Sequence, residues 1–542
     1  MSRRLRSHRT FGAETLILCV AVFLTATGSP AFWRGLLAGR AWTDAGTWTI
    51  VAGVGVMLTA LHFAVGALFG PRLLLRPVLA ILLLISASAS FYAQRYGVVL
   101  DPSMIQNVLA TDVREAGELL TLDMALHFTF FGLLPAALVL AVQVRKRPWK
   151  RALLIRLGAL AVALLVGVLS LVAVFQDFAS VMRNQKSLRY TLAPTNVLWS
   201  LGVVATESFG HRTTPREPPD PAVRTERPGR RPTLLVIVVG ETVRAANWQL
   251  NGYARDTTPQ LAARADLVSF TRASACGTAT EVSLPCMFSP YGRTDYDATR
   301  IRLTDSLLHL LARSGFAVVW RDNQSGCKGV CSGLPEINLS RSTVPGLCAE
   351  GRCFDEILLH ELGEGLDAQK GDQVVVLHPL GNHGPAYYRR YPAEDRHWTP
   401  ACEKNELRDC TRDEIVNAYD NAIRYTDRML SKTLDLLSAR AATHDVAMVY
   451  LSDHGESLGE RGLYLHGVPY AIAPREQLEI PKFWWLPEAS AQGLGIDLDC
   501  LRKRADEPVS HDHLYHSVLG LLEVQTPRYR SERDVFAGCR RR

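Results

Sequence analysis

The sequence predicts an α/β protein in two parts, with five membrane-spanning helices followed by an exported domain built on a mainly parallel sheet. Five apolar segments lie within residues 14–175. After residue 233, β-branched apolar runs alternate with helical patterns, as in parallel sheets that helices cover on both faces. Ten of the eleven cysteines come after residue 270, which is typical of a domain that folds in an oxidising compartment. The chain of 542 residues is long enough for at least two domains.

The apolar segments are close to the length that crosses a bilayer, which is about 20 residues for a helix. They cover residues 14–29, 47–69, 76–94, 123–143 and 153–175. The first follows the basic stretch SRRLRSHR, as a signal peptide would, but no convincing small-residue cleavage site follows it, so we expect a retained helix. Buried core helices of a soluble protein are the alternative, and the segment lengths disfavour it.

Basic residues gather at one side of these segments and predict their orientation. They lie in SRRLRSHR before the first segment, in PRLLLR after the second and in VRKRPWKR after the fourth. The positive-inside rule places all three in the cytoplasm, so five spans end on the opposite side of the membrane. The net charge of +7 is explained in this way. We find no basic stripe with interleaved aromatics and expect no nucleic-acid partner.

Two connecting segments separate these parts. Between the third and fourth spans, at about residues 95–122, the pattern predicts an amphipathic helix that carries Asn107, Thr111 and Glu115 on one face. That face could contact the exported domain or a lipid headgroup, or the helix could simply be solvated at the interface. Residues 212–232 are rich in Pro and Arg and predict an extended linker. We therefore expect a membrane domain over 1–175, a bridging helix and linker over 176–232, and an exported domain over 233–542.

The exported cysteines suggest disulfide bonds. Their close spacing favours the pairs Cys276–Cys286, Cys327–Cys331, Cys348–Cys353 and Cys402–Cys410, which leaves Cys500 and Cys539 for a fifth. A zinc site in CKGVC is the alternative, but the neighbouring residues do not supply the partners that a zinc ribbon needs.

The sequence places polar residues directly after four apolar runs, LLVIVV, FAVVW, QVVVLH and VAMVYLS. Helical patterns over 303–314, 355–367 and 413–439 lie between the runs. Ligands of parallel sheets bind beyond the carboxyl ends of the strands. The residues at these ends are Glu241, Asp322, Asn323, His378, His383, Asp453 and His454. Buried carboxylates and imidazoles at one edge carry a desolvation cost unless a cation or substrate satisfies them.

A divalent metal fits this set, because zinc accepts carboxylate and imidazole ligands. Glu241, Asp453 and His454 supply three ligands. The alternative is that Asp453 caps the following turn and His454 packs at the surface. The nucleophile is expected in SACGTATEVSLPCMFS, because a metal activates a bound hydroxyl. Thr278, Thr280 and Ser283 are the candidates, and their spacing does not choose between them.

Five motifs together resemble a known family. They are GETVRAANWQLNGYARDTTPQL, CGTATEVSLPCMF, DNQSGCKGVC, GNHGPAYYRRYP and YLSDHGESLGERGLYLHGVPY. In this order they resemble the phosphoethanolamine transferases that modify lipid A, which include the mobile colistin-resistance enzymes. The resemblance covers nearly the whole chain. It implies an alkaline-phosphatase-like α/β/α domain in the periplasm, anchored in the Gram-negative inner membrane.

The resemblance also implies a role for individual residues. Thr280 matches the nucleophile and completes a zinc tetrahedron with Glu241, Asp453 and His454. His383 and His466 match histidines that hold the substrate phosphate and can bind zinc beyond the one tightly bound ion. Lys328 matches a cation near the phosphoryl oxygens. Three residues match groups near the ethanolamine headgroup, namely Asn107, Thr111 and Glu115.

The expected reaction is transfer of phosphoethanolamine from phosphatidylethanolamine to a lipid A phosphate by a monomeric enzyme, through phosphothreonine, with polymyxin resistance as the outcome. Another lipopolysaccharide sugar or a periplasmic glucan is the alternative acceptor. A sulfatase is disfavoured, because Thr280-Glu281-Val282 lacks the Cys/Ser-x-Pro-x-Arg pattern. A phosphoglycerol transferase usually has few disulfides, and a catalytically inactive scaffold would lack a metal ligand.

Overall fold

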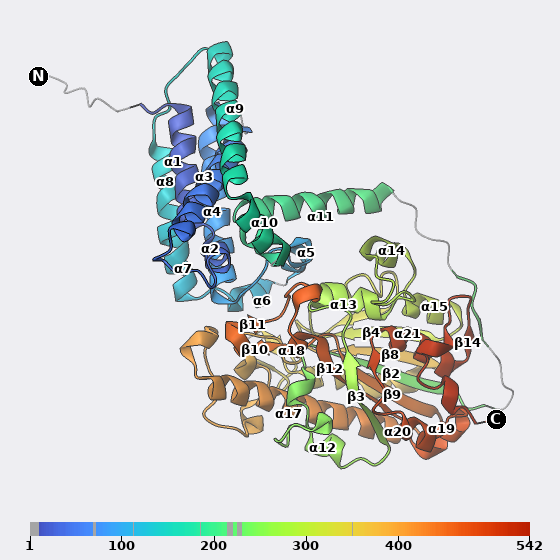
Figure 1. Cartoon of the computed structure of the whole chain (residues 1–542). Helices are drawn as coiled ribbons and strands as arrows, with labels where there is room; N and C mark the ends of the chain where they lie inside the picture. The colour runs from blue at the N-terminus through green and yellow to red at the C-terminus, as the bar shows by residue number, and fades with distance from the viewer. Residues whose placement is uncertain are drawn as a thin grey trace, which may run out of the picture. The chain divides into compact units, whose positions relative to one another are not determined.

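The computed structural model describes residues 10–68, 72–111, 113–184, 186–213, 220–224, 230–349 and 351–541. The chain forms two compact units. The membrane unit combines Met1–Ile105 with Leu120–Ala205, and the catalytic unit combines Gln106–Leu119 with Thr206–Arg542. Figure 1 shows both units.

Long apolar helices form the membrane unit and confirm the predicted spans. Among the described residues, four helices are long and apolar enough to cross a membrane, and a bent helix pair gives a fifth span if it is counted as one. The pair, α1 (Ala13–Thr27) and α2 (Pro30–Leu36), bends by 60° where a proline begins the second helix. The others are α3 (Ala45–Leu68), α4 (Arg72–Arg95), α7–α8 (Leu122–Phe128 and Leu134–Ala141, joined by a π-helical turn at Thr129–Leu133) and α9 (Trp149–Ala173). The helices α10 (Phe175–Asn184) and α11 (Thr195–Thr213) follow.

The segment between the third and fourth spans differs from the prediction of one amphipathic helix. It contains two short helices, α5 (Pro102–Ala110) and α6 (Val113–Glu118). Thr111 lies outside both, and its hydroxyl donates to the carbonyl of Asn107 at 2.7 Å. The side chain of Glu115 falls outside the described residues. A β-branched residue whose hydroxyl bonds to the backbone one turn earlier is a weak helix former, which accounts for a helix end at this position.

An eight-stranded sheet forms the centre of the catalytic unit, in the order β13-β3-β12-β9-β2-β8-β4-β5. The strands are β2 (Thr233–Gly240), β3 (Leu267–Ser274), β4 (Ala317–Asp322), β5 (Glu336–Asn338), β8 (Gln373–His378), β9 (Asp445–Ser452), β12 (Glu479–Trp485) and β13 (Val509–Ser510). Only β12 runs antiparallel to its neighbours, β3 and β9. The mainly parallel sheet predicted from the apolar runs is therefore confirmed.

Helices cover both faces of this sheet, as Figure 1 shows. Successive residues of β2 alternate between two buried cores. One core includes α13 (Thr280–Met287), α15 (Leu307–Arg313), α19 (Glu488–Gly493), α20 (Leu498–Lys503) and α21 (Asp512–Leu522). The other includes α12 (Pro259–Ala262), α16 (Leu362–Ala368) and α17 (Arg412–Ser438). Because both faces are covered, functional side chains are left to the edge where the strands end.

Two of the three helices predicted for this unit are shorter than expected. The pattern over 303–314 divides into α14 (Ala298–Leu303) and α15, because Ser306 forms a capping box with His309 and starts a new helix. The pattern over 355–367 divides into a 3₁₀ turn at Asp355–Leu359 and α16. The third pattern, over 413–439, corresponds to α17.

The linker is less loose than its composition predicts. Within 212–232, Val223 and Arg224 form strand β1 and pair with β14 (Val524–Gln525). Arg231 makes an ion pair with Asp445 at 2.6 Å. Two of its described parts, 220–224 and 230–232, are therefore attached to the catalytic unit.

Five disulfide bonds stabilise the catalytic unit. They join Cys276 to Cys286, Cys327 to Cys331, Cys348 to Cys353, Cys402 to Cys410 and Cys500 to Cys539. These are the pairs that close spacing suggests, and Cys19 in the membrane unit is free.

Candidate functional site

Glu241, Asp453 and His454 meet beyond the carboxyl ends of β2 and β9, the two central strands. The Nε2 atom of His454 lies 3.5 Å from Oε1 of Glu241 and 3.3 Å from Oδ2 of Asp453. The hydroxyl of Thr280 lies 3.4 Å from the same Oε1 of Glu241 and 3.5 Å from Nε2 of His454. Four potential ligand atoms thus converge from three separate segments of the chain.

The spacing of these atoms fits a tetrahedral zinc ion. Ligand atoms placed about 2.0 Å from a common centre at tetrahedral angles lie about 3.3 Å from one another. The four distances above are 3.3–3.5 Å, at or slightly above this value. The Oδ2 atom of Asp453 is buried without a hydrogen-bond partner in the described residues. A buried carboxylate oxygen of this kind is costly unless a cation satisfies it.

Hydrogen bonds and burial prepare each ligand for a metal. Burial lowers the pKa of His454 to about 3, so its imidazole is neutral. Its Nδ1 atom donates to the carbonyl of Gly455 at 2.9 Å, which leaves the Nε2 lone pair for a metal. Burial acts to raise the pKa of Glu241, but neighbouring groups, among them the Thr242 hydroxyl that donates to its carboxylate, lower it to about 2. Burial and the Glu241 carboxylate together raise the pKa of Asp453 well above its usual range.

The backbone at Thr242 is strained in support of these ligands. Its φ of 61° is in the left-handed region, which β-branched residues rarely adopt. Its amide donates to Oδ1 of Asp453 at 3.0 Å, and its hydroxyl donates to Oε1 of Glu241 at 2.5 Å. Tyr419 fixes the same residue by donating to its carbonyl at 2.6 Å. The strained residue therefore orients both carboxylates of the cluster.

Of the three hydroxyl candidates, the structure brings only Thr280 to the cluster. Thr280 is the first residue of α13, where the helix dipole favours negative charge. The hydroxyl of Thr278 instead donates to the carbonyl of Val468 at 2.7 Å. Ser283 is fully buried one turn into α13, and its hydroxyl has no partner among the described residues.

His511 braces the loop before Thr280 and was not found by sequence reasoning. Its Nδ1 atom accepts from the amide of Cys276 at 3.0 Å, and its Nε2 atom lies 2.8 Å from the carbonyl of Ser452. The imidazole thus joins the hydroxyl-bearing loop to the end of β9, directly before Asp453. A histidine within a helical pattern gives no sequence signal of this contact.

His383 and His466 lie beside the cluster. The ring of His466 is 4.4 Å from that of His454 and 5.4 Å from that of His383, measured between centroids. Glu456 is a fully buried residue that sequence reasoning missed. Its Oε2 atom lies 2.9 Å from the Nδ1 atom of His466. Tyr387 donates to the other oxygen of Glu456 at 2.6 Å. The carboxylate fixes the orientation of His466, as carboxylates do for histidines in metal sites.

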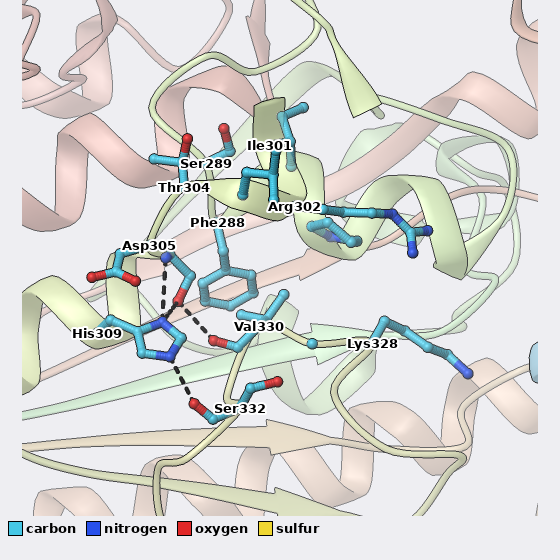
Figure 2. Close-up of a pocket in the computed structure, with 14 residues that line it drawn as sticks. Phe288, Ser289, Ile301, Arg302, Thr304, Asp305, His309, Lys328, Val330 and Ser332 are labelled. Carbon is cyan, nitrogen blue, oxygen red and sulfur yellow. Dashed lines mark hydrogen bonds between the residues drawn. The ribbon is translucent and has the colours of Figure 1, made fainter. Parts of the chain in front are cut away.

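The described contacts of Lys328 are with residues outside this cluster. Its ammonium group donates to the hydroxyl of Ser325 at 2.7 Å. It also lines a pocket of about 340 Å³ next to α13. Figure 2 shows the Phe288 ring in the middle of this pocket, with His309 on one side and Arg302 and Lys328 extending to the other. The volume is within the range of small-molecule sites, about 300–1,000 Å³.

The remaining strand-end residues, Asp322, Asn323 and His378, make two separate contacts. His378 bonds through Nδ1 to Oδ1 of Asp322 at 2.7 Å, and both side chains are fully buried. Asn323 donates to Oδ1 of Asp355 at 2.8 Å. These polar residues lie at the same sheet edge, and their carboxylate and amide partners are protein groups, whereas Nε2 of His378 is buried without a hydrogen-bond partner in the described residues. Asn107 and Thr111 are partly buried and contact one another.

Comparisons with known proteins identify the family of the chain. The profile of the sulfatase family matches residues 233–524, and that of phosphoethanolamine transferase EptA/EptB matches residues 58–209. The chain is 38% identical over 480 residues to phosphoethanolamine transferase EptA of Escherichia coli, covering 86% of each chain. It is 35% identical over 547 residues to phosphatidylethanolamine transferase Mcr-1 of Escherichia coli, covering 98% of each chain.

A solved structure is similar over the whole length. This is the integral membrane lipooligosaccharide phosphoethanolamine transferase A (EptA) from Neisseria meningitidis, with a TM-score of 0.94 and 38% identity. The match covers 98% of this chain and 100% of that chain. It confirms the predicted fold, a membrane domain followed by an alkaline-phosphatase-like α/β/α domain.

Proposed function

The chain belongs to the EptA family of phosphoethanolamine transferases, and from this premise we propose that it moves phosphoethanolamine from phosphatidylethanolamine to a lipid A phosphate. It is a multi-pass protein of the inner membrane with its catalytic domain in the periplasm. Both proposed substrates are lipids, which accounts for a catalytic domain tethered to a membrane.

One observation carries the proposal most directly. The hydroxyl of Thr280 lies within 3.5 Å of Glu241 and His454, at the first residue of a helix. We assign Glu241, Asp453, His454 and Thr280 as ligands of one zinc ion, which would lower the pKa of the hydroxyl and offset charge on the phosphoryl group. We assign His383 and His466 to a further zinc ion or to the substrate phosphate.

The proposed transfer proceeds in two steps. The Oγ1 atom of Thr280 attacks phosphorus and forms phosphothreonine, while the bond to diacylglycerol breaks and that oxygen takes the hydroxyl proton. A lipid A phosphate oxygen then attacks the same phosphorus, and the Thr280 oxygen leaves and regains a proton. His466, oriented by Glu456, is positioned to transfer these protons. The N-terminus of α13 and the Lys328 side chain favour the negative phosphoryl oxygens.

This transfer has a physical consequence at the cell surface. The added ethanolamine carries a positive charge and offsets the negative charge of a lipid A phosphate. Cationic peptides such as polymyxins are then bound less strongly. We therefore propose that the enzyme confers polymyxin resistance. We also propose that it acts as a monomer.

Mass spectrometry of lipid A from cells that express the full chain tests the proposal. We expect one added phosphoethanolamine with the wild-type protein and none with Thr280→Ala. Ser283→Ala is the matched control, because it removes a hydroxyl from the same helix outside the cluster. Transfer by Thr280→Ala would overturn the nucleophile assignment. Phosphoethanolamine on another lipopolysaccharide sugar or on a glucan would instead overturn lipid A as the acceptor.

A further inference from the structure

Part of the loop between the third and fourth spans belongs to the catalytic unit. The stretch Gln106–Leu119 groups with that unit, whereas the residues on either side group with the membrane unit. Arg302 donates to Oε1 of Gln106 at 3.4 Å, and Lys328 donates to the carbonyl of Ala110 at 3.5 Å. Both cations line the pocket of Figure 2, where their side chains extend to the same side. The N-terminal half of the stretch is therefore in contact with the pocket next to α13.

A buried ion-pair cluster holds the other end of the stretch. Glu118, the last residue of α6, is 2% exposed. Its Oε2 atom accepts from Nη2 of Arg390 at 2.5 Å, and its Oε1 atom pairs with Nη1 of Arg352. Arg390 is itself 4% exposed. Charged side chains are rarely buried unless they are paired, and removal of this carboxylate would leave two guanidinium groups facing one another.

The same cluster reaches the candidate active site. The Nε atom of Arg390 donates to the carbonyl of His383 at 2.6 Å. One guanidinium thus joins the Glu118 carboxylate to the backbone of a histidine beside the metal ligands. The planar guanidinium makes both contacts at once, so its position is fixed by the carboxylate on one side and by the site on the other.

We propose that Glu118 is a positioning residue for the transfer reaction: held between Arg352 and Arg390, it seats the 106–119 stretch on the catalytic unit and fixes Arg390 behind His383. The stretch then forms one side of the site that binds the phosphoethanolamine-bearing lipid. The inference rests on the proposed function. It explains why residues 106–119, which belong to a loop between two membrane spans, lie next to the site. Glu118 holds them there without binding substrate.

The ion pairs of Glu118 with Arg352 and Arg390 form an anchor for the 106–119 stretch. Loss of this anchor has a defined effect on the kinetics. If only the seated conformation binds donor lipid well, the apparent KM rises by the reciprocal of the seated fraction. The chemical step in the seated fraction is unchanged, because Thr280 and the metal ligands are unaltered. A residue that merely stabilised the fold would instead lower the amount of active enzyme and leave KM unchanged.

The test measures donor kinetics with the full-length enzyme in detergent micelles that contain a fluorescent phosphatidylethanolamine. We expect Glu118→Gln to raise the KM for the donor by about tenfold or more, with kcat changed much less. Arg352→Gln keeps the Glu118–Arg390 pair and should raise KM by a smaller factor. Hydrogen exchange of the same samples should show faster exchange in residues 106–119 of Glu118→Gln and unchanged exchange in β2 and β9.

Rescue and control variants separate the ion pair from a general effect on folding. The double variant Glu118→Arg with Arg352→Glu restores opposite charges and keeps the contact between Arg390 and His383. It should reverse much of the rise in KM that Glu118→Arg alone causes. Asp499→Asn is the matched control, because it breaks an exposed ion pair with Arg502 at 2.7 Å.

The outcomes are distinguishable from failure of the proposed function. If the wild-type enzyme transfers no phosphoethanolamine, the proposed function fails. If it does, and Glu118→Gln has the wild-type KM or the wild-type exchange in residues 106–119, the anchor is wrong. A lower yield of active Glu118→Gln at unchanged KM also overturns the anchor, because it indicates only a stabilising role.

Discussion

Two carboxylate–histidine groups lie at the same edge of the central sheet and differ in how their polar atoms are satisfied. Asp453 and His454 follow β9, whereas Asp322 and His378 end β4 and β8. All four side chains are fully buried. Asp322 accepts four hydrogen bonds, from His378, the Trp320 indole and the amides of Gln324 and Gly326. Asp453 keeps one oxygen without a partner in the described residues.

The difference separates a structural pair from a ligand set. A carboxylate whose oxygens are all occupied by protein donors has little capacity left for a metal. A buried carboxylate with an open oxygen, facing a neutral imidazole and a hydroxyl, has that capacity. Residue type and location at the carboxyl end of a strand are alike in both cases, and the hydrogen-bond partners distinguish the two groups.

Replacement of Asp453 should give the largest effect. Asp453→Asn removes a negatively charged ligand, and we expect a loss of transfer of about 10³-fold together with loss of bound zinc. The metal-free protein should not become less stable, because a neutral amide replaces an unsatisfied buried carboxylate. Lipid A transfer assays, metal analysis and thermal unfolding measure these three effects. Full zinc occupancy in the variant would contradict the ligand assignment.

Replacement of Asp322 should have the opposite profile. Asp322→Asn weakens the bonds from backbone amides and from His378, and we expect the free energy of unfolding to fall by about 2–3 kcal/mol. Zinc content should stay at the wild-type level, and the folded protein should keep most of its transfer rate. Denaturant unfolding and metal analysis test this. Loss of zinc with unchanged stability would show that the two groups had been assigned the wrong way round.

Lys482 is a third buried titratable residue of the central sheet, and we expect its effect on stability to be smaller than that of Asp322. It lies on β12 opposite Leu451, is fully buried, and donates to the carbonyl of Ser510 at 3.2 Å. Burial lowers its pKa from 10.5 to about 7. Between pH 7 and pH 10.5 the unfolded chain therefore binds a proton that the folded chain has lost. The free energy of unfolding rises with pH across this range. The contribution of Lys482 to stability is complete above pH 10.5 and is lost as the pH falls towards 7.

The replacement Lys482→Met removes this pH dependence. The free energy of unfolding of the wild-type protein, relative to Lys482→Met, should rise by about 1.5 kcal/mol between pH 7 and pH 8.5. Denaturant unfolding of both proteins at the two pH values measures the difference. A constant difference would show that Lys482 keeps its charge in the folded protein.

Much of this site could be predicted from the sequence because its ligands follow continuous apolar runs. Strands β2 and β9 are buried on both faces, so no polar residue interrupts them until Glu241 and Asp453. Those polar residues therefore mark the strand ends and the functional edge. The choice of Thr280 came from family resemblance, since the hydroxyls of its loop look alike in sequence.

Other features gave no such pattern. Strand β12 carries a proline and Lys482 within EIPKFWW, so its place in the sheet depends on tertiary contacts. Glu456 resembles a surface turn residue, yet it is buried against His466 and Tyr387. The seating of Glu118 between two arginines is a long-range contact, which local periodicity does not encode.

The strained residue Thr242 has a consequence for attempts to engineer this enzyme. A glycine there would relieve the left-handed backbone, which for most residues costs about 1–2 kcal/mol. A search guided by thermal stability would therefore favour that change. The same change would remove the hydroxyl that holds Glu241 and would loosen the turn that orients Asp453. Selection for a more heat-resistant protein and selection for a faster one would then favour different residues at this position.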